Sequence, residues 1–305
     1  MMQQYFDIKK QYPDTILFFR LGDFYEMFYD DAKLASRELD LTLTGRDCGQ
    51  EERAPMCGVP FHSYETYVAK LIAKGYKVAI CEQMEDPALA KGLVKRAIIR
   101  VITPGTVLES SMLDEGRNNF LCSLCAAENR AGVCFADIST GELHATLLSA
   151  KNAAELTAQV QNELSRFSPK EILINDGVLD LSALPQFIKN RFGASVEMPG
   201  EEKFDPKAAA GEVTAQFAGK SLDDLRLSDK PEITGALGAL LSYLKETERT
   251  GLERLNSLDL YSGGQYMRLN LTTRRNLELL ETMRSKEKRG SLLWVLDRTR
   301  TPMGK

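Results

Sequence analysis

Residues 16–29 read ILFFRLGDFYEMFY, and this stretch decides the fold of the first hundred residues. The apolar run predicts a buried strand, Gly22-Asp23 predicts a tight turn, and the aromatic residues after it predict a second extended segment. Side chains two residues apart in an extended segment project from one face. We therefore expect Phe24 and Glu26 on one face of this segment and Tyr25 on the other.

Two interpretations of Phe24-Tyr25-Glu26 follow from this geometry. In the first, an exposed aromatic ring enters the minor groove of DNA, unstacks a base step, and stands beside a carboxylate that can hydrogen-bond a base. In the second, the aromatic residues belong to the hydrophobic core and the glutamate is a solvated charge, which is the commoner arrangement in strands. The pattern of these three residues leaves both interpretations open.

Length and charge limit the function classes. The chain has 305 residues and a net charge of −4. Two or three domains are expected, because single cores rarely grow beyond roughly 250 residues. The acidic balance does not indicate a general nucleic-acid-binding surface, so any DNA contact must be local. Basic side chains outnumber acidic ones in residues 62–105 and 265–305, which are candidate phosphate-contacting segments or solvated faces.

Cysteine usage and hydropathy favour a cytoplasmic protein. The six cysteines and the lack of a secretory signal predict reduced, buried thiols. Cys122 and Cys125 have the spacing of metal ligands, but no second pair lies nearby and a strand would turn them to opposite faces. We therefore expect no metal site. The longest apolar stretch without charges, residues 233–244, is too short to span a bilayer, so no membrane contact is expected.

The fold class predicted for the chain is mixed α/β. Residues 1–105 are expected to form a mixed-sheet α/β domain, and 106–116 a linker. The strands expected in the first domain lie at 16–21, 41–44, 76–83 and 95–102. Its helices are expected from Asp30-Asp31 and over 64–72, where apolar residues recur with helical spacing.

A second domain is predicted over residues 117–248. Three short strands at 120–126, 132–138 and 142–148 are separated by turn residues, which predicts an antiparallel meander. A helix capped by Asn152 with Glu155 follows, and then further strands and helices alternate, which is the outline of a ribonuclease-H-like fold.

Residues 249–305 are expected to begin a third, all-α domain. Its elements would be a strand-like segment at 258–261, a helix over 272–283, and an apolar helix from residue 292. The last helix has little left in the chain to pack against.

Two further motifs carry possible chemistry. Gly219-Lys220-Ser221 resembles the end of a phosphate-binding loop, but the glycine required five residues before Gly219 is Thr214, so a plain loop is expected. Asp137 and Glu142 suggest a metal-dependent nuclease, yet no further carboxylates converge with them, and we expect them to flank a hairpin. No catalytic residues are therefore assigned.

Several motifs, in the same order along the chain, closely resemble bacterial DNA mismatch-recognition proteins of the MutS family. They are LFFRLGDFYEMFYDDA (17–32), PMCGVPFH (55–62), AICEQ (79–83), TPGT (103–106), DISTGE (137–142), TRRNLE (273–278) and TPMG (301–304). The resemblance covers the whole chain and implies a mismatch-recognition domain, a connector domain, and the start of the core or lever domain.

The resemblance also implies roles for residues. Phe24 would enter the minor groove and stack on a mispaired or unpaired base, Glu26 would hydrogen-bond that base, and Tyr25 would support the segment from behind. The partner implied is mismatched double-stranded DNA, with DNA mismatch repair as the process.

In the full-length family, ATP and magnesium serve a C-terminal ATPase, a homodimer forms, and downstream repair proteins bind. We expect this chain to lack the ATPase, to need no cofactor, to be no enzyme, and to be monomeric. Two rival functions remain: a ribonuclease-H-like metal-dependent nuclease, and a protein-interaction scaffold that reads no mismatch.

Overall fold

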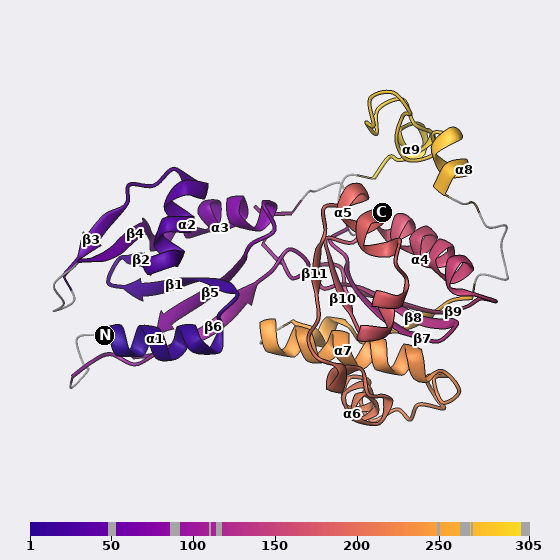
Figure 1. Ribbon diagram of the computed structural model, residues 1–305, viewed down its shortest axis with the longest axis horizontal. Helices are drawn as coiled ribbons and strands as arrows, with labels where there is room; N and C mark the ends of the chain where they lie inside the picture. Colours follow the sequence, from indigo (N-terminus) through magenta and orange to yellow (C-terminus); the bar gives the residue numbers. More distant parts are fainter. Residues whose placement is uncertain are drawn as a thin grey trace. The chain divides into compact units, whose positions relative to one another are not determined.

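The computed structural model describes residues 1–47, 53–85, 92–109, 111–113, 118–248, 251–262, 269 and 271–299. The chain divides into two compact units, which are treated separately (Figure 1). The first comprises Met1–Leu113 and Leu244–Leu252, and the second Asp114–Tyr243 and Glu253–Lys305. The domain boundaries predicted near residues 105, 117 and 249 stay predictions.

A six-stranded mixed sheet forms the centre of the first unit. Its strand order is β3-β4-β2-β1-β5-β6, in which β1 and β5 run parallel and all other neighbours run antiparallel. The strands are β1 (Thr15–Leu21), β2 (Phe24–Phe28), β3 (Thr44–Arg46), β4 (Ala54–Pro60), β5 (Lys77–Gln83) and β6 (Arg96–Ile102). Strands β1 and β2 are those predicted from residues 16–29.

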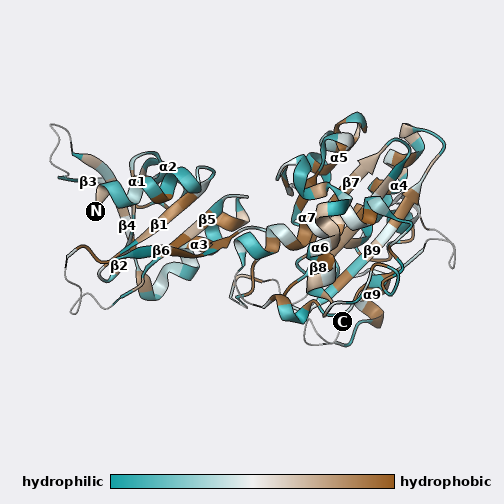
Figure 2. Cartoon of the chain, turned by 90° about the horizontal axis from the view of Figure 1, so that it is seen from below, coloured by the Kyte–Doolittle hydropathy of each residue, from teal (hydrophilic) through white to brown (hydrophobic). Residues whose placement is uncertain are grey.

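Helices cover both faces of this sheet (Figure 1). Helices α2 (Tyr29–Leu39) and α3 (Tyr64–Ala73) lie on one face, and α1 (Met2–Gln11) lies on the other. The core strands are predominantly hydrophobic, whereas the outer sides of the helices are hydrophilic (Figure 2). Burial of these apolar faces against the sheet stabilises the unit, since short helices are marginal alone.

Asp31 joins three elements of the first unit. Its carboxylate accepts hydrogen bonds from the main-chain N–H of Leu17 at 3.0 Å, from Lys9 Nζ at 2.9 Å and from the Tyr5 hydroxyl at 3.3 Å. The sequence predicted only that a helix begins at Asp30-Asp31. Helix α1, which supplies Tyr5 and Lys9, was not predicted.

For the first unit, one prediction is wrong and one strand was missed. The strand expected at 41–44 is wrong: β3 begins at Thr44 and includes Gly45, because Thr44–Arg46 pair antiparallel with β4. Strand β4 itself was not predicted as a strand. Its hydrogen bonds to both β2 and β3 determine this edge of the sheet, and such long-range pairing is not visible in local residue patterns.

The second unit contains the predicted antiparallel meander. Strands β7 (Leu121–Ala127), β8 (Arg130–Asp137) and β9 (Glu142–Ser149) pair in sequence, and β10 (Glu171–Ile174) and β11 (Ser195–Glu197) continue parallel to β7. The order β11-β10-β7-β8-β9 is the ribonuclease-H-like arrangement expected from the sequence. Strand β12 (Asp259–Leu260) extends this sheet beside β9, whereas the sequence interpretation places it in the third domain.

Helices pack on both faces of the second sheet. Helices α4 (Ala153–Phe167) and α5 (Leu184–Arg191) cover one face, and α7 (Pro231–Thr247) crosses the other, near α6 (Pro206–Gln216). Asn152 caps α4 by accepting a hydrogen bond from the N–H of Glu155 at 2.9 Å, as predicted. Gly132 permits the close crossing of α7, because a Cβ at this position would lie 2.2 Å from the Glu232 backbone.

The last described segment carries two short helices, α8 (Leu271–Asn276) and α9 (Leu292–Leu296). The helix expected to continue to Met283 ends seven residues earlier, and Glu278 already has a left-handed φ of 47°. The apolar side chains of Leu277, Leu280, Met283 and α9 are exposed. Among the described residues, little packs against α9, as the sequence predicted. No helix in the described part of the chain is long and apolar enough to cross a membrane.

Candidate nucleic-acid interface

The turn at Gly22-Asp23 places Phe24 at the tip of the β1–β2 hairpin. Leu21 pairs directly with Phe24, so two residues make the reversal. Gly22 adopts a φ of 57°, a left-handed conformation that glycine adopts without strain. The reversal that the sequence predicted is therefore present, and it exposes the first residue of β2.

The side chains of Phe24 and Tyr25 lie on opposite faces of β2. Phe24 is 46% exposed, whereas Tyr25 is 4% exposed. The Tyr25 ring packs 5.1 Å from the Tyr64 ring, and burial together with nearby Glu82 raises the pKa of the Tyr25 hydroxyl. Tyr25 is thus a core residue behind the hairpin, and Phe24 is not a core residue.

Glu26 lies on the same face as Phe24 and is held by Arg46 of β3. Glu26 Oε2 accepts a hydrogen bond from Arg46 Nη1 at 2.5 Å. The Glu26 side chain is 17% exposed and the Arg46 side chain is 37% exposed. Residues paired directly across an antiparallel sheet share a face. Since Glu26 pairs with Gly58 and Arg46 pairs with Ala54, the ion pair lies over β4 on that shared face.

Gly58 provides the space in which these side chains lie. A Cβ added at this position would be 3.5 Å from Glu26 Cγ, 3.7 Å from Phe24 Cδ1 and 3.3 Å from the Tyr25 carbonyl oxygen. The absence of a side chain here lets Phe24 and Glu26 lie close to the backbone of β4. This part of the site was not predicted, because β4 was not recognised as a strand.

Arg20 fixes the other side of the hairpin tip. Its guanidinium carbon lies 3.7 Å from the centre of the Phe61 ring, and Nη1 is 3.3 Å from Glu82 Oε1. The main-chain N–H of Phe61 donates to the Asp23 carbonyl oxygen at 3.0 Å. These contacts join the hairpin to the segment that follows β4, and they hold the hairpin tip that carries Phe24 in place. The sequence interpretation missed Arg20 and Arg46 in this role.

Part of the basic segment 62–105 holds the fold. Arg96 donates from Nε to the Arg20 carbonyl oxygen at 2.7 Å. Arg100 pairs with the carboxylates of Glu109 and Glu248. These guanidinium groups are engaged within the first unit, so the excess of basic residues in this segment overstates the charge available to DNA phosphates.

The carboxylates considered for a nuclease have structural contacts. Asp137 is fully buried and accepts hydrogen bonds from the main-chain N–H groups of Asn119 and Ser139, each at 2.9 Å. Glu142 lies 3.2 Å from His144 Nε2. Asp137 therefore closes the β8–β9 turn, as the hairpin interpretation predicted. Within the ranges described above, no group of three or more potential ligand side chains could hold a metal ion.

The remaining motifs also occupy structural positions. Gly219-Lys220-Ser221 lies in a turn after helix α6, with no strand before it, which confirms the loop prediction. Cys122 belongs to the core on the α4 side, whereas Cys125 approaches Gly235 of α7, so their thiols face opposite sides of the sheet. Cys48 lies outside the described residues.

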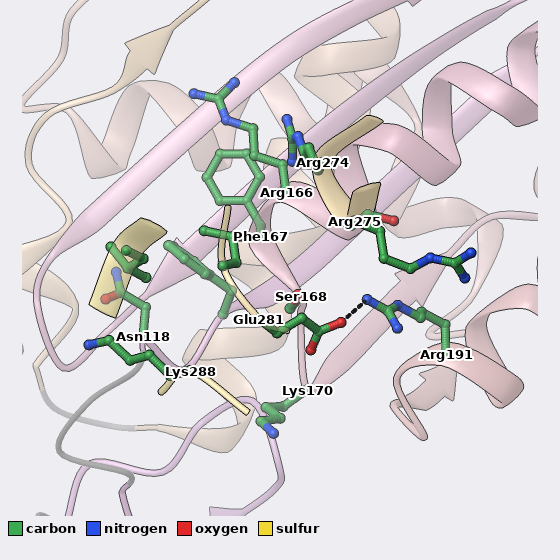
Figure 3. Close-up of a pocket in the computed structure, with 14 residues that line it drawn as sticks. Asn118, Arg166, Phe167, Ser168, Lys170, Arg191, Arg274, Arg275, Glu281 and Lys288 are labelled. Carbon is green, nitrogen blue, oxygen red and sulfur yellow. Dashed lines mark hydrogen bonds and ion pairs between the residues drawn. The ribbon is translucent and has the colours of Figure 1, made fainter. Parts of the chain in front are cut away.

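A cavity of about 350 Å³ lies in the second unit, between the end of α4 and the segment containing α8 (Figure 3). Its lining includes Arg166, Lys170, Arg274 and Arg275, which approach it from several sides, and the neutral donors Asn118 and Ser168. Among the lining residues, Arg191 is paired with Glu281 at 3.0 Å. The charge of this cavity favours an anion, but its lining contains no nucleophile paired with a base.

Comparison with known proteins identifies the family. Residues 1–111 match the family model of MutS domain I, residues 119–259 match MutS domain II, and residues 272–305 match MutS domain III. The chain belongs to the MutS family. Phe24, Glu26, Arg46 and Gly58 all lie within the MutS domain I match.

Curated MutS relatives match the whole chain. It is 50% identical over 304 residues to the DNA mismatch repair protein MutS of Acetivibrio thermocellus and 50% identical to that of Ruminiclostridium cellulolyticum. It is 48% identical over 305 residues to that of Caldanaerobacter subterraneus. The match covers 100% of this chain and 34% of each of these three MutS proteins, so the chain spans about a third of their length.

Proposed function

We propose that this MutS-family chain binds mismatched double-stranded DNA in DNA mismatch repair, with Phe24 as the wedge that enters the minor groove. The observation that carries the proposal is the 46% exposure of Phe24 at the hairpin tip, next to a carboxylate on the same face. An exposed aromatic ring can stack on a base, because every base offers a π-face to such a ring.

The energetics favour mismatches over paired steps. Stacking of an aromatic ring on a base contributes about 1–3 kcal/mol. Against it stand unstacking, which costs a few kcal/mol, and bending of the duplex, which costs about 1–6 kcal/mol. Because a mismatch has already lost part of its pairing and stacking, insertion of Phe24 is less costly there. Discrimination then arises mainly from the deformability of the step.

Glu26 sharpens this discrimination. A carboxylate near phosphates lowers affinity for every duplex, unless a base donates a hydrogen bond in return. A charge-assisted hydrogen bond contributes about 1.5–3 kcal/mol, and it forms only where a base is displaced by Phe24. Tyr25 acts indirectly, because its buried ring holds the strand from which Phe24 and Glu26 project.

The experiment is competition binding of a heteroduplex against a homoduplex of the same length at one fixed salt concentration. The 305-residue chain is expected to prefer the heteroduplex, and Phe24→Ala is expected to lose that preference. Phe6→Ala serves as the matched control, since Phe6 is 37% exposed on α1 of the same unit. Equal preference in wild type and Phe24→Ala would reject the proposal.

Further properties are part of the same proposal. Stacking and hydrogen bonding need no cofactor, so none is assigned to this binding, and no catalysis is assigned to the chain. A homodimer, downstream repair partners, ATP, magnesium and a cytoplasmic location follow from the family resemblance alone. A nuclease function lacks support because Asp137 is committed to the β8–β9 turn.

A further inference from the structure

The ion pair between Glu26 and Arg46 places a compensating charge inside the proposed DNA-reading site. Arg46 Nη1 lies 2.5 Å from Glu26 Oε2, and the two residues come from strands separated by β4. Arg46 thus reaches across the strand of Gly58 to the carboxylate that faces the same side as Phe24. Among the described side chains, only Arg46 lies within ion-pair distance of Glu26.

This pairing changes the charge that DNA meets. A lone carboxylate beside the phosphates would repel any duplex, whereas a carboxylate paired with a guanidinium is close to neutral at that range. Glu26 can also readily give up its ion pair with Arg46 for another hydrogen-bonding partner. The Arg46 side chain is 37% exposed and the Glu26 side chain is 17% exposed, and a partly exposed ion pair is weaker than a charge-assisted hydrogen bond formed away from water.

We propose that Arg46 is a specificity-determining residue that restrains Glu26 until a displaced base is present. On a fully paired duplex, the Glu26–Arg46 pair stays closed and limits repulsion. On a mismatch, Glu26 turns from Arg46 to the base that Phe24 has displaced. The ion pair therefore raises affinity for every duplex. It also reduces the extra affinity for a mismatch, because Glu26 must leave Arg46 before it can bind the displaced base. This inference rests on the proposed function and extends it to a residue on β3.

Removal of Arg46 should have opposite effects on affinity and discrimination. Without the guanidinium, Glu26 repels a homoduplex fully, so homoduplex affinity falls. At a mismatch the carboxylate no longer has to leave a partner, so heteroduplex affinity falls less. The expected result for Arg46→Ala is a rise of about two- to five-fold in the ratio of heteroduplex to homoduplex affinity, the range that corresponds to a weak, partly exposed ion pair.

The test measures this ratio for wild type, Arg46→Ala, Glu26→Gln and the double variant Arg46→Ala/Glu26→Gln. Glu26→Gln should reduce the ratio and raise homoduplex affinity. When Glu26→Gln is already present, Arg46→Ala should leave the ratio unchanged, because no carboxylate remains to be restrained. Arg37→Ala is the matched control, as Arg37 is an exposed arginine paired with Glu38 on α2. Arg46→Lys, which keeps the charge, should stay near wild type.

A ratio of heteroduplex to homoduplex affinity that is unchanged or lower in Arg46→Ala would overturn the inference. It would also be overturned if Arg46→Ala changed this ratio as much in the Glu26→Gln background as in wild type. These outcomes differ from failure of the proposed function, in which wild type itself shows no preference or Phe24→Ala retains it. Thermal unfolding of each free variant checks the fold. Should Arg46→Ala melt early, Arg46→Gln gives the same comparison with more of the side chain retained.

Discussion

Phe24 lies diagonally across from Gly58, so that a Cβ on Gly58 would stand 3.7 Å from Phe24 Cδ1. The same Cβ would stand 3.5 Å from Glu26 Cγ, directly opposite on β2. One residue without a side chain therefore lies beside both proposed DNA-reading side chains. Phe24 is the first residue of β2, which lies between β1 and β4, and its side chain projects from the sheet face at the hairpin tip.

Gly58→Ala should displace Phe24 and Glu26 with little loss of stability. The added Cβ meets the Tyr25 carbonyl oxygen at 3.3 Å, which is a tight contact, so the backbone between Phe24 and Glu26 must shift by a few tenths of an ångström and carry both side chains with it. We expect the heteroduplex preference to fall several-fold in competition binding, while the melting temperature changes by only a few degrees. An unaltered preference would show that this space does not position the two side chains.

Phe24→Ala and Phe18→Ala should differ sharply in stability. Phe18 is fully buried beside Tyr25, and truncation of a core phenylalanine costs about 3–5 kcal/mol. Phe24 projects from the hairpin tip, so its truncation should cost less than about 1 kcal/mol. Urea unfolding of both variants measures the difference. A loss for Phe24→Ala as large as that for Phe18→Ala would restore the interpretation of Phe24 as a core residue.

The stability of the first unit should depend on pH through Glu248. Burial raises the pKa of Glu248 to about 7 in the folded protein, even though Arg100 Nε lies 2.5 Å away. The folded state then binds a proton more tightly than the unfolded state does. The free energy of unfolding should accordingly fall as the pH rises from about 4.5 to 7, by roughly 1–3 kcal/mol.

Glu248→Gln isolates this pH effect. The variant cannot titrate at this position, so its free energy of unfolding should vary less over the same pH range. Chemical denaturation at several pH values gives both slopes, and the comparison of slopes removes the constant effect of the substitution. Identical slopes in wild type and Glu248→Gln would contradict the assignment.

Asp137→Ala should destabilise the second unit without revealing a lost enzyme activity. The substitution leaves the buried N–H groups of Asn119 and Ser139 without the carboxylate that accepts their hydrogen bonds, at a cost of about 2–4 kcal/mol. Duplex DNA incubated with magnesium should remain intact with either protein. Cleavage by wild type that disappears in a stably folded Asp137→Ala variant would favour the nuclease alternative.

Local patterns predicted the elements that local rules govern. The turn at Gly22-Asp23, the opposite faces of Phe24 and Tyr25, and the Asn152 cap of α4 follow from backbone and side-chain preferences within a few residues. The antiparallel meander of β7, β8 and β9 was also predicted, because short connections favour antiparallel neighbours.

Long-range partners were not predictable in the same way. Arg46 meets Glu26 only because β4 pairs with both β2 and β3, and nothing near Arg46 in the sequence indicates that pairing. Helix α1 was missed because its few buried side chains, such as Tyr5, give a weak periodic signal. Strand β12 was not predicted to join the second sheet, because two residues carry too little pattern to identify the sheet they join.

The wedge role of Phe24 is tested most directly by the fluorescence of 2-aminopurine placed beside a mismatch, since this base brightens when it is unstacked. At saturating protein, wild type should increase the fluorescence of the heteroduplex and leave that of the homoduplex unchanged. Phe24→Ala and Phe24→Leu, at concentrations that give equal occupancy, should produce little or no increase. An equal increase with Phe24→Ala would contradict the account, because it would mean that the base is displaced without the aromatic ring.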